Sequence, residues 1–495
     1  MTDKIQINVM RRNLKVICLI LFFWMITSCA VNPVTGKKEL ALISENQELA
    51  MGREYDPQII QAYGLYEDEK LMRFITEKGR AMGAISHRPH LEYHFRILDS
   101  PILNAFAVPG GYVYFTRGIL AHFNNEAEFA GVLGHEIGHI TARHTVRQQS
   151  RQVLGTIALI GAMVVSEDLR NFGDEAAAGL QLLFLKYGRD DETQSDQLGV
   201  EYSSKVGYDA REMAGFFNTL KKASDRAGGG SLPTFLSTHP DPGDRNRKVY
   251  DWAVEWQRAN PGKNVKIKRN EYLEMIDGII HGEDPRQGYV ENDYFYHPTL
   301  RFQMPVPRMW RTQNSPSQFQ MSPEDGNALM VLTFGKGNTV NEAANDFIQT
   351  NQLSEVERKN VTVYGNPAVS VVSDHTPPAG QGQASTPLRI LSYFIQYNNN
   401  IYHIYGLSRR DQFNDYFMTF NFTMTNFRTL TDAAKLNKKP VRVRVVPAGN
   451  TAPLRQLLLG QGMRQEWLED LAMLNGLELT DTVERGTLFK ILREE

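Results

Sequence analysis

The order of apolar and polar residues predicts helices and a small sheet in the first part of the chain. Apolar residues recur at helical spacing through residues 45–85, which indicates helix. Residues 93–100, YHFRILDS, alternate between apolar and polar positions as a half-buried strand does. Residues 104–118, NAFAVPGGYVYFTRG, predict two strand segments around a Pro-Gly-Gly turn.

More helices are expected further along the chain. Asn125 is a residue type that caps helices, so a helix is expected to begin after it. Residues 153–165 are thirteen nearly continuous apolar residues, too few to cross a membrane. We expect a buried core helix there; a segment that dips into a membrane or covers a functional site is the alternative. Helical periodicity continues over residues 174–207 and 209–227.

The pattern changes beyond Trp256. Residues 260–270 are polar and basic, which indicates a solvated linker. Aromatic and β-branched residues then alternate over residues 294–430, with one helical interval at 339–353. This pattern predicts an α+β domain with an antiparallel sheet, in which residues 375–387 form an exposed hairpin loop. It is similar to the pattern of small PsbP- or Mog-like α+β domains.

The C-terminal segment resembles a LysM module. The matching features are an opening strand VRVRVV, a G-N-T turn at 449–451, LAMLNGL at 471–477 and ERGTLFKIL at 484–492. Residues 452–461 depart from the usual LysM pattern. A working peptidoglycan binder and a degenerate structural relative are therefore both open.

The first 29 residues have the composition of a targeting segment. Arg11, Arg12 and Lys15 precede an eleven-residue apolar run at 16–26, and I-T-S-C follows, ending at Cys29. Such an order is typical of a secretory signal peptide. I-T-S-C resembles a bacterial lipobox, which implies that Cys29 is acylated. An ordinary signal peptide cut nearby and an uncleaved anchor are the alternatives.

Composition and cysteine use narrow the class of protein. A chain of 495 residues exceeds one core, so several domains are expected. A net charge of −2 gives no sign of nucleic-acid binding. With Cys18 removed and Cys29 acylated, no thiol remains, which suits an oxidising periplasm. We expect a lipid-anchored protein of the bacterial cell envelope, and Ala30 after the cysteine favours the outer membrane over the inner.

Candidate chemistry lies in GVLGHEIGHITARH, residues 131–144, which contains an H-E-x-x-H motif. On a helix, His135 and His139 lie on one face, about 6 Å apart at Cβ, and can bind one zinc ion. Glu136 is placed to take a proton from a water whose pKa zinc lowers to about 7. Three glycines in this helix, each costing about 1 kcal/mol relative to alanine, indicate close approach of another backbone.

A catalytic zinc ion needs a third protein ligand. Glu192 and Asp196 form another pair at helical spacing within YGRDDETQSDQLG. Glu192 can complete a His-His-Glu set, and Asp196 can accept the remaining N–H of a ligand histidine. The alternative is a solvated acidic helix face, because Asp190, Asp191 and Glu192 are consecutive.

Four blocks in this order resemble the HtpX- and BepA-like zinc metallopeptidases, family 48 of the metallopeptidases, in the periplasmic lipoprotein branch. The resemblance covers roughly residues 32–255, and the blocks are NAFAVPGGYVYFTRGIL, GHEIGHITARH, YGRDDETQSD and LSTHPDPGDR. The third block stands in the place of the family's E-x-E-A-D. Gln194 and Ser195 depart from its acidic-alanine pair, whereas Glu192 and Asp196 remain.

The resemblance implies one Zn²⁺ per chain and a role for each site residue. The implied metal ligands are His135, His139 and Glu192. Glu136 would be the general base, and His239 and Arg245 would approach the metal. His239 would either hydrogen-bond the developing oxyanion or occupy the open zinc position as a gate.

The first block implies an edge strand that binds an extended peptide by strand addition, which reads backbone more than side chains. The residues of this strand are Asn104, Phe106, Ala107 and Val108. Such a site suits unfolded or misassembled chains as substrates. An edge strand of this kind favours peptide substrates over glycan substrates.

The expected fold class is α+β multidomain. A mainly helical gluzincin catalytic domain with a small sheet precedes an antiparallel α+β domain and a small LysM-like domain. We expect a lipoprotein signal peptide at 1–28, a zinc metallopeptidase domain at 29–258, a linker and helix at 259–292, an α+β domain of unknown role at 293–432 and a LysM-like domain at 440–495.

The predicted function is a zinc-dependent endopeptidase that degrades unfolded or misassembled envelope proteins. One alternative is a chaperone or scaffold with a gated or inactive zinc site. The other is a cell-wall protein that binds peptidoglycan or acts on it. No nucleic-acid partner is expected.

Overall fold

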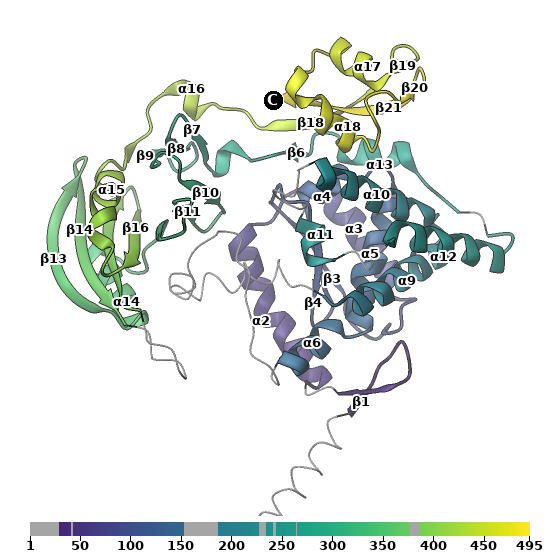
Figure 1. Ribbon diagram of the computed structural model, residues 1–495, viewed down its shortest axis with the longest axis horizontal. Helices are drawn as coiled ribbons and strands as arrows, with labels where there is room; N and C mark the ends of the chain where they lie inside the picture. Colours follow the sequence, from purple (N-terminus) through teal and green to yellow (C-terminus); the bar gives the residue numbers. More distant parts are fainter. Residues whose placement is uncertain are drawn as a thin grey trace, which may run out of the picture.

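The computed structural model describes residues 29–40, 43–152, 187–226, 234–240, 244–263, 265–376 and 386–495 (Figure 1). The predictions for residues 1–28 and 153–165, and most of the predicted loop at 375–387, lie outside these ranges. In the described part of the chain, no helix is both long and apolar enough to cross a membrane.

The first half of the chain is mainly helical, as predicted. It starts with a hairpin of β1 (Cys29–Val31) and β2 (Lys38–Leu40). The helices that follow are α2 (Glu45–Tyr63), α3 (Glu69–Gly83), α4 (Arg117–His122), α5 (Glu126–Thr141), α6 (His144–Gln152), α9 (Arg189–Lys205), α10 (Arg211–Arg226), α11 (Thr234–Thr238), α12 (Arg245–Ala259) and α13 (Arg269–Ile276).

The predicted helical stretch at 45–85 is divided into α2 and α3. Gly64 follows α2 with a positive φ of 68°, a conformation that glycine adopts without the steric cost of a Cβ. Asp68 then caps α3, because its Oδ1 accepts from the backbone N–H of Leu71 at 2.9 Å. The chain between the two helices passes close to Leu98, through a β-bridge to Leu65.

The small sheet contains the strands that the sequence predicted. Its strands are β3 (His94–Leu98), β4 (Ala105–Val108) and β5 (Tyr112–Thr116), in the order β3-β5-β4. β3 runs parallel to β5 and β4 antiparallel to it. β4 therefore lies at an edge of the described sheet.

Helix α5 runs through the middle of this region, and each of its residues is buried. It begins as predicted, since Asn125 Oδ1 accepts from the backbone N–H of Glu128 at 2.8 Å. Its glycines allow close packing: a Cβ on Gly134 would lie 3.0 Å from Cα of Gly199 in α9. The close backbone approach expected from the three glycines is confirmed.

The second region is built on a seven-stranded antiparallel sheet, drawn at the left of Figure 1. Its strands, in sheet order, are β10 (Arg311–Asn314), β11 (Phe319–Ser322), β12 (Ala328–Phe334), β16 (Asn400–Arg409), β15 (Leu388–Tyr397), β14 (Asn366–His375) and β13 (Ser354–Val363). A smaller sheet precedes it in the chain, made of β7 (Tyr289–Glu291), β8 (Tyr294–His297) and β9 (Phe302–Pro305), with β17 (Arg428–Thr429) added at its edge.

Two helices pack against the large sheet, although the sequence predicted one. α14 (Val340–Thr350) lies within the expected interval. α15 (Phe413–Thr425) was not expected, because its aromatic residues continue the composition of the strands. Phe413, Phe417 and Phe420 nevertheless follow the i, i+4, i+7 spacing of a helix, and Phe413 and Phe420 are buried in the core.

The C-terminal unit has a strand-helix-helix-strand order. β18 (Val441–Pro447) pairs antiparallel with β21 (Leu488–Glu494), and α17 (Leu454–Gly460) and α18 (Leu468–Leu474) lie between them in the chain. β6 (Ile280–His281) pairs with the other side of β18. Apolar residues of this unit belong to the same buried core as those of α3, α5 and α13. The unit therefore packs directly on the helical region (Figure 1).

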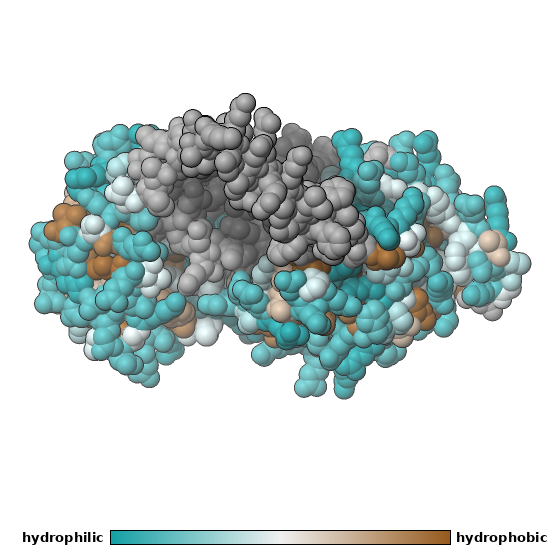
Figure 2. Space-filling view, turned by 90° about the horizontal axis from the view of Figure 1, so that it is seen from below, coloured by the Kyte–Doolittle hydropathy of each residue, from teal (hydrophilic) through white to brown (hydrophobic). Residues whose placement is uncertain are grey.

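The described part of one face of the molecule is largely polar. The face shown in Figure 2 is mainly hydrophilic around the grey residues, with hydrophobic side chains gathered in small areas. This agrees with a chain that is 42% hydrophobic and 22% charged.

Candidate metal centre

Two crossing helices bring the predicted metal ligands together. α5 carries His135 and His139 on one face, and α9 carries Glu192 in its first turn. All three side chains are fully buried. The close contact of Gly134 with Gly199 sets how near α9 lies to α5.

The donor atoms of these three residues converge on one point. Nε2 of His135 and Nε2 of His139 are 2.9 Å apart. Glu192 Oε1 lies 3.4 Å from Nε2 of His139, and Glu192 Oε2 lies 3.5 Å from Nε2 of His135. Zinc bonds of about 2.0–2.1 Å in a tetrahedron place neighbouring donors about 3.3 Å apart, so the spacing fits zinc.

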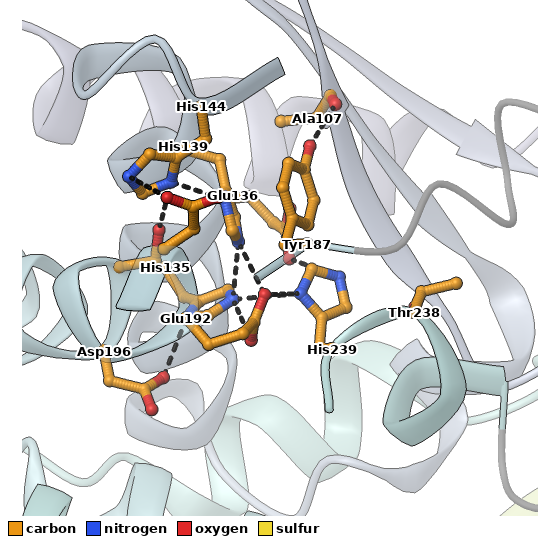
Figure 3. Close-up of polar contacts among 12 residues, drawn as sticks. Ala107, His135, Glu136, His139, His144, Tyr187, Glu192, Asp196, Thr238 and His239 are labelled. Atoms are coloured by element: carbon orange, nitrogen blue, oxygen red, sulfur yellow. Dashed lines mark hydrogen bonds and ion pairs between the residues drawn. The ribbon is translucent and has the colours of Figure 1, made fainter. Parts of the chain in front are cut away.

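His239 joins this cluster as a fourth donor. It follows α11 in the S-T-H-P block, and its Nδ1 lies 3.0 Å from Glu192 Oε1 and 3.2 Å from His135 Nε2. In the described chain, His135, His139, Glu192 and His239 form one group whose ligand atoms lie within 4.8 Å of one another (Figure 3).

Each histidine of the group has a partner at its second ring nitrogen, which favours one tautomer. Nδ1 of His135 lies 2.9 Å from Asp196 Oδ1. Nε2 of His239 lies 3.3 Å from the carbonyl oxygen of Ala105. Nδ1 of His139 lies 2.9 Å from Nδ1 of His144 (Figure 3). The other ring nitrogen, which is Nε2 in His135 and His139 and Nδ1 in His239, therefore faces the other ligands.

Charges inside the site favour the protonation states that bind a metal. Burial lowers the pKa of both His135 and His139 well below its ordinary value, so the rings are neutral. Burial also acts to raise the pKa of Glu192. The positive charges of the neighbouring His239 and Arg245 act against burial, and that pKa stays well below the ordinary value. Neutral imidazoles and a carboxylate are the forms that bind zinc.

Arg245 stabilises the carboxylates behind the ligands. Its Nε and one Nη donate to the two oxygens of Asp196 at 2.8 and 2.6 Å, and the same Nη lies 3.2 Å from Glu192 Oε2. Another Nη donates to the carbonyl oxygen of His239 at 3.2 Å. The guanidinium also lies 3.9 Å from the ring centre of Phe217. Arg245 therefore contacts the site through Glu192, Asp196 and the backbone of His239.

Glu136 lies beside the metal ligands. Its side chain is fully buried, and within the described chain neither carboxylate oxygen has a hydrogen-bond partner. Such a group costs about 1–3 kcal/mol unless something satisfies it, so the site fits a bound metal and its water. Burial raises the pKa of Glu136 to about 7. The closest charged contact is Nε2 of His239, 3.7 Å from Glu136 Oε1.

The edge strand β4 contacts the site through its backbone. Ala105 accepts from His239, and the carbonyl oxygen of Ala107 accepts from the hydroxyl of Tyr187 at 3.2 Å (Figure 3). Phe106 and Val108, on the opposite face, pack in a small core with Tyr114. Asn104 precedes the strand: its backbone N–H donates to Oγ1 of Thr116, and its carbonyl oxygen accepts from the backbone N–H of Thr116. The outward carbonyls of β4 are thus bonded to Tyr187 and His239.

Two residues of the site were not predicted. The ring of Tyr187 stacks on His139 with centroids 3.8 Å apart, and His144 contacts Nδ1 of His139. His144 lies five residues after His139, so the sequence motif contained a signal for it. Tyr187 precedes α9 and carries no comparable signal, since its position depends on the backbone bond from its N–H to the carbonyl of Thr238.

Comparisons with known proteins agree with this geometry. Residues 69–253 match the model of Peptidase family M48. The chain is 30% identical over 222 residues to a beta-barrel assembly-enhancing protease of Yersinia pestis, covering 43% of this chain and 45% of that protein. It is 28% identical over 212 residues to the mitochondrial metalloendopeptidase OMA1 of Arabidopsis thaliana, covering 42% and 40%. The chain thus spans less than half the length of these relatives.

Among solved structures, cyanobacterial PsbP from Synechocystis sp. PCC 6803 is similar to 28% of this chain and 91% of its own, at 8% identity and a TM-score of 0.23. A TM-score this low does not establish a common fold. The match to the model of Peptidase family M48 and the buried cluster fall in the same part of the chain, residues 69–253. Its candidate zinc donors are His135, His139, Glu192 and His239.

Proposed function

We propose that the protein is a zinc-dependent endopeptidase that cleaves unfolded or misassembled proteins of the bacterial envelope. The observation that carries the proposal is the buried His-His-Glu set with Glu136 beside it, whose carboxylate has no hydrogen-bond partner in the described chain. A buried carboxylate next to neutral imidazoles is costly for stability alone, and it suits a general base.

The side chains divide the work in the following way. His135, His139 and Glu192 would hold zinc, which supplies a Lewis acid that activates water and polarises a peptide carbonyl. Glu136 takes the proton that the attacking water loses and passes it to the leaving amine. Asp196 and Arg245 keep Glu192 and His135 in place, because they hold the second ring nitrogen and the second carboxylate oxygen.

A role as a gate for His239 is part of the proposal. A catalytic zinc site keeps one position open for water and substrate, whereas four protein donors close it. Nδ1 of His239 lies among the donors, and its Nε2 bonds to the edge strand. We propose that His239 moves away when substrate binds, and that the hydrogen bond between Tyr187 and the carbonyl oxygen of Ala107 breaks at the same time. In the active state it would be free to hydrogen-bond the developing oxyanion.

The substrate class is proposed from the edge strand. The carbonyls of Ala105 and Ala107 point away from β5, to the side where His239 and Tyr187 bond to them. An extended peptide that displaced these two side chains would add there as a further strand. Recognition through backbone groups suits unfolded chains of varied sequence. The similarity to the beta-barrel assembly-enhancing protease of Yersinia pestis supports envelope proteins as substrates.

The anchor and the C-terminal unit are further parts of the proposal. We propose that Cys29, the first residue of β1, is acylated and holds the protein at the periplasmic side of the outer membrane. For residues 440–495 we propose a structural LysM relative rather than a glycan binder. The loop after α18 is already engaged, since a Cβ on Gly476 would lie 3.0 Å from the side chain of Asn124 in the helical region.

The test compares two substrates. The purified full-length protein is incubated with casein and, separately, with peptidoglycan sacculi, before and after a chelator removes zinc. We expect hydrolysis of casein that stops without zinc and returns when zinc is added, and no soluble fragments from sacculi. Release of sacculus fragments would instead support the cell-wall alternative.

A chaperone or scaffold with a closed site is the second candidate, because the four protein donors and the bonded edge strand describe an inactive arrangement. His239→Ala separates the two functions. If His239 is a gate, this variant keeps its zinc and hydrolyses casein faster than the parent. If zinc is bound and both proteins are inert, the scaffold is the better explanation.

A further inference from the structure

The zinc ligand His139 is held by an unusual partner. Ligand histidines generally donate their second N–H to a carboxylate, a backbone carbonyl or water. Nδ1 of His139 instead lies 2.9 Å from Nδ1 of His144, which is also fully buried. A histidine accepts at one nitrogen only when its ring is neutral and its proton is on the other nitrogen. Something must therefore fix the proton of His144.

Gln194 has the right atom in the right place. Its Oε1 lies 2.9 Å from Nε2 of His144. An amide oxygen is an acceptor, so the proton of His144 belongs on Nε2, and Nδ1 of His144 carries a lone pair. That lone pair accepts the N–H of His139 Nδ1, which leaves the lone pair of His139 Nε2 facing His135 and Glu192.

The other groups around His144 agree with this direction. The hydroxyl of Ser195 lies 3.3 Å from Nδ1 of His144 and can donate to the same lone pair. Asp191 Oδ1 is 4.0 Å from Nε2 of His144, too far for a hydrogen bond, and is paired with Arg147. Gln194 is thus the acceptor within hydrogen-bond distance of Nε2 in the described chain.

We propose that Gln194 is a positioning residue of the metal centre. Its side-chain oxygen fixes the tautomer of His144 and, through it, the tautomer in which His139 presents Nε2 to zinc. In the opposite tautomer a proton on His139 Nε2 would point into the ligand set and exclude the metal. This inference rests on the proposed zinc site.

Zinc affinity tests the inference directly. Gln194→Met keeps the length of the side chain and removes the acceptor. Gln197→Met is the matched control, because Gln197 is an exposed glutamine on the same helix. Affinities are measured on the full-length zinc-free proteins by competition with a chromophoric chelator. We expect Gln194→Met to bind zinc about 10–100-fold more weakly than the parent, with Gln197→Met unchanged.

Two further variants separate positioning from packing. Gln194→Glu restores an acceptor at the same distance and is expected to recover the parent affinity and the parent absorption spectrum of the Co²⁺-loaded protein. Gln194→Asn withdraws the acceptor by one methylene and is expected to lose affinity, which keeps the test decisive if Gln194→Met does not fold. Far-ultraviolet circular dichroism of each zinc-free variant should match that of the parent.

The possible results have distinct meanings. Parent-like zinc affinity in both Gln194→Met and Gln194→Asn would overturn the inference while leaving the zinc site intact. Equal losses in Gln194→Glu and Gln194→Met would also overturn it, because the acceptor would then not be the cause. A parent protein that binds no zinc would overturn the proposed function itself.

Discussion

Glu136 depends on its burial for the chemistry that we propose. A solvated glutamate is ionised and too weakly basic to hold a proton near neutral pH, whereas burial raises the pKa of Glu136 to about 7. The charge of His239 acts in the opposite direction, and so would a bound zinc cation. The working pKa is therefore expected between the ordinary value for glutamate and about 7.

This environment predicts an acid limb in the activity. The base must be deprotonated to act, so kcat/KM should fall as pH falls through the pKa of Glu136. Casein hydrolysis measured from pH 5 to pH 9 is expected to show this limb with an apparent pKa of about 5–7. Zinc content is measured at each pH as the control, because protonation of the ligand histidines would release the metal. A rate that does not change over this range would contradict the assignment.

The contact between α5 and α9 is the element-scale feature on which the site depends. Glycines lie on both sides of the crossing, and a Cβ at Gly134 would meet the backbone of Gly199. α9 carries Glu192, so any increase in the distance between the helices moves one ligand away from the two histidines of α5.

Gly134→Ala is expected to lower the stability of the fold, although alanine has a higher helix propensity than glycine. Overpacking costs about 1–3 kcal/mol, against about 1 kcal/mol gained in propensity. Gly215→Ala is the control, because Gly215 is an exposed glycine of α10 whose Cβ would meet nothing within 4 Å. Thermal unfolding should show a lower melting temperature for Gly134→Ala and a higher one for Gly215→Ala. Zinc affinity should fall only in Gly134→Ala.

The elements that the sequence predicted are those with an unambiguous local signal. Asn125 begins α5, and the Pro-Gly-Gly turn separates β4 from β5. The division of residues 45–85 at Gly64 and the helix α15 were missed. In the first case, apolar residues kept their helical spacing on both sides of Gly64, so the pattern did not show where α2 ends. In the second, aromatic residues typical of strands masked a helical spacing, and packing against the sheet decided the outcome.

At the scale of the whole molecule, the C-terminal unit completes the region that carries the metal site. Lys490 of β21 is fully buried, and its Nζ donates to the carbonyl oxygens of Ala121, Phe123 and Leu474, each at 2.8 Å. Ala121 and Phe123 lie at the end of α4, just before Asn125 begins α5. Lys490 thus donates hydrogen bonds to backbone carbonyls that lie just before the start of α5, the helix that carries His135 and His139.

Lys490→Met should therefore destabilise the metal site as well as the C-terminal unit. The change leaves three buried carbonyls without a donor, and we expect a loss of about 3–5 kcal/mol in the free energy of unfolding. Lys439→Met, at an exposed lysine before β18, is the control and should change little. Denaturant unfolding measures both. Equal stability of the two variants would show that the hydrogen bonds of Lys490 do not stabilise the fold.

The pairing of His135 with His139 was visible in the sequence because residues four positions apart share one face of a helix. Spacing alone left Glu192 open between a metal ligand and a solvated acidic face, and the resemblance to family 48 favoured the ligand. The surroundings of these ligands were not visible, because they come from separate parts of the chain. Tyr187 and His144 contact His139 only after α9 and the end of α5 have packed. The contact of Arg245 with Glu192 joins residues 53 positions apart in the sequence. Local patterns identified the chemistry, and tertiary packing determined its orientation.

The central claim is that one zinc ion bound by His135, His139 and Glu192 works with Glu136 to cleave peptide bonds. The most direct test measures zinc content and casein hydrolysis of the full-length protein and of Glu136→Gln, each also in the His239→Ala background. We predict about one zinc ion per chain in all four proteins. Glu136→Gln should lower the rate about 10²–10⁴-fold in the active background. Absence of zinc, or activity that survives Glu136→Gln, would contradict the claim.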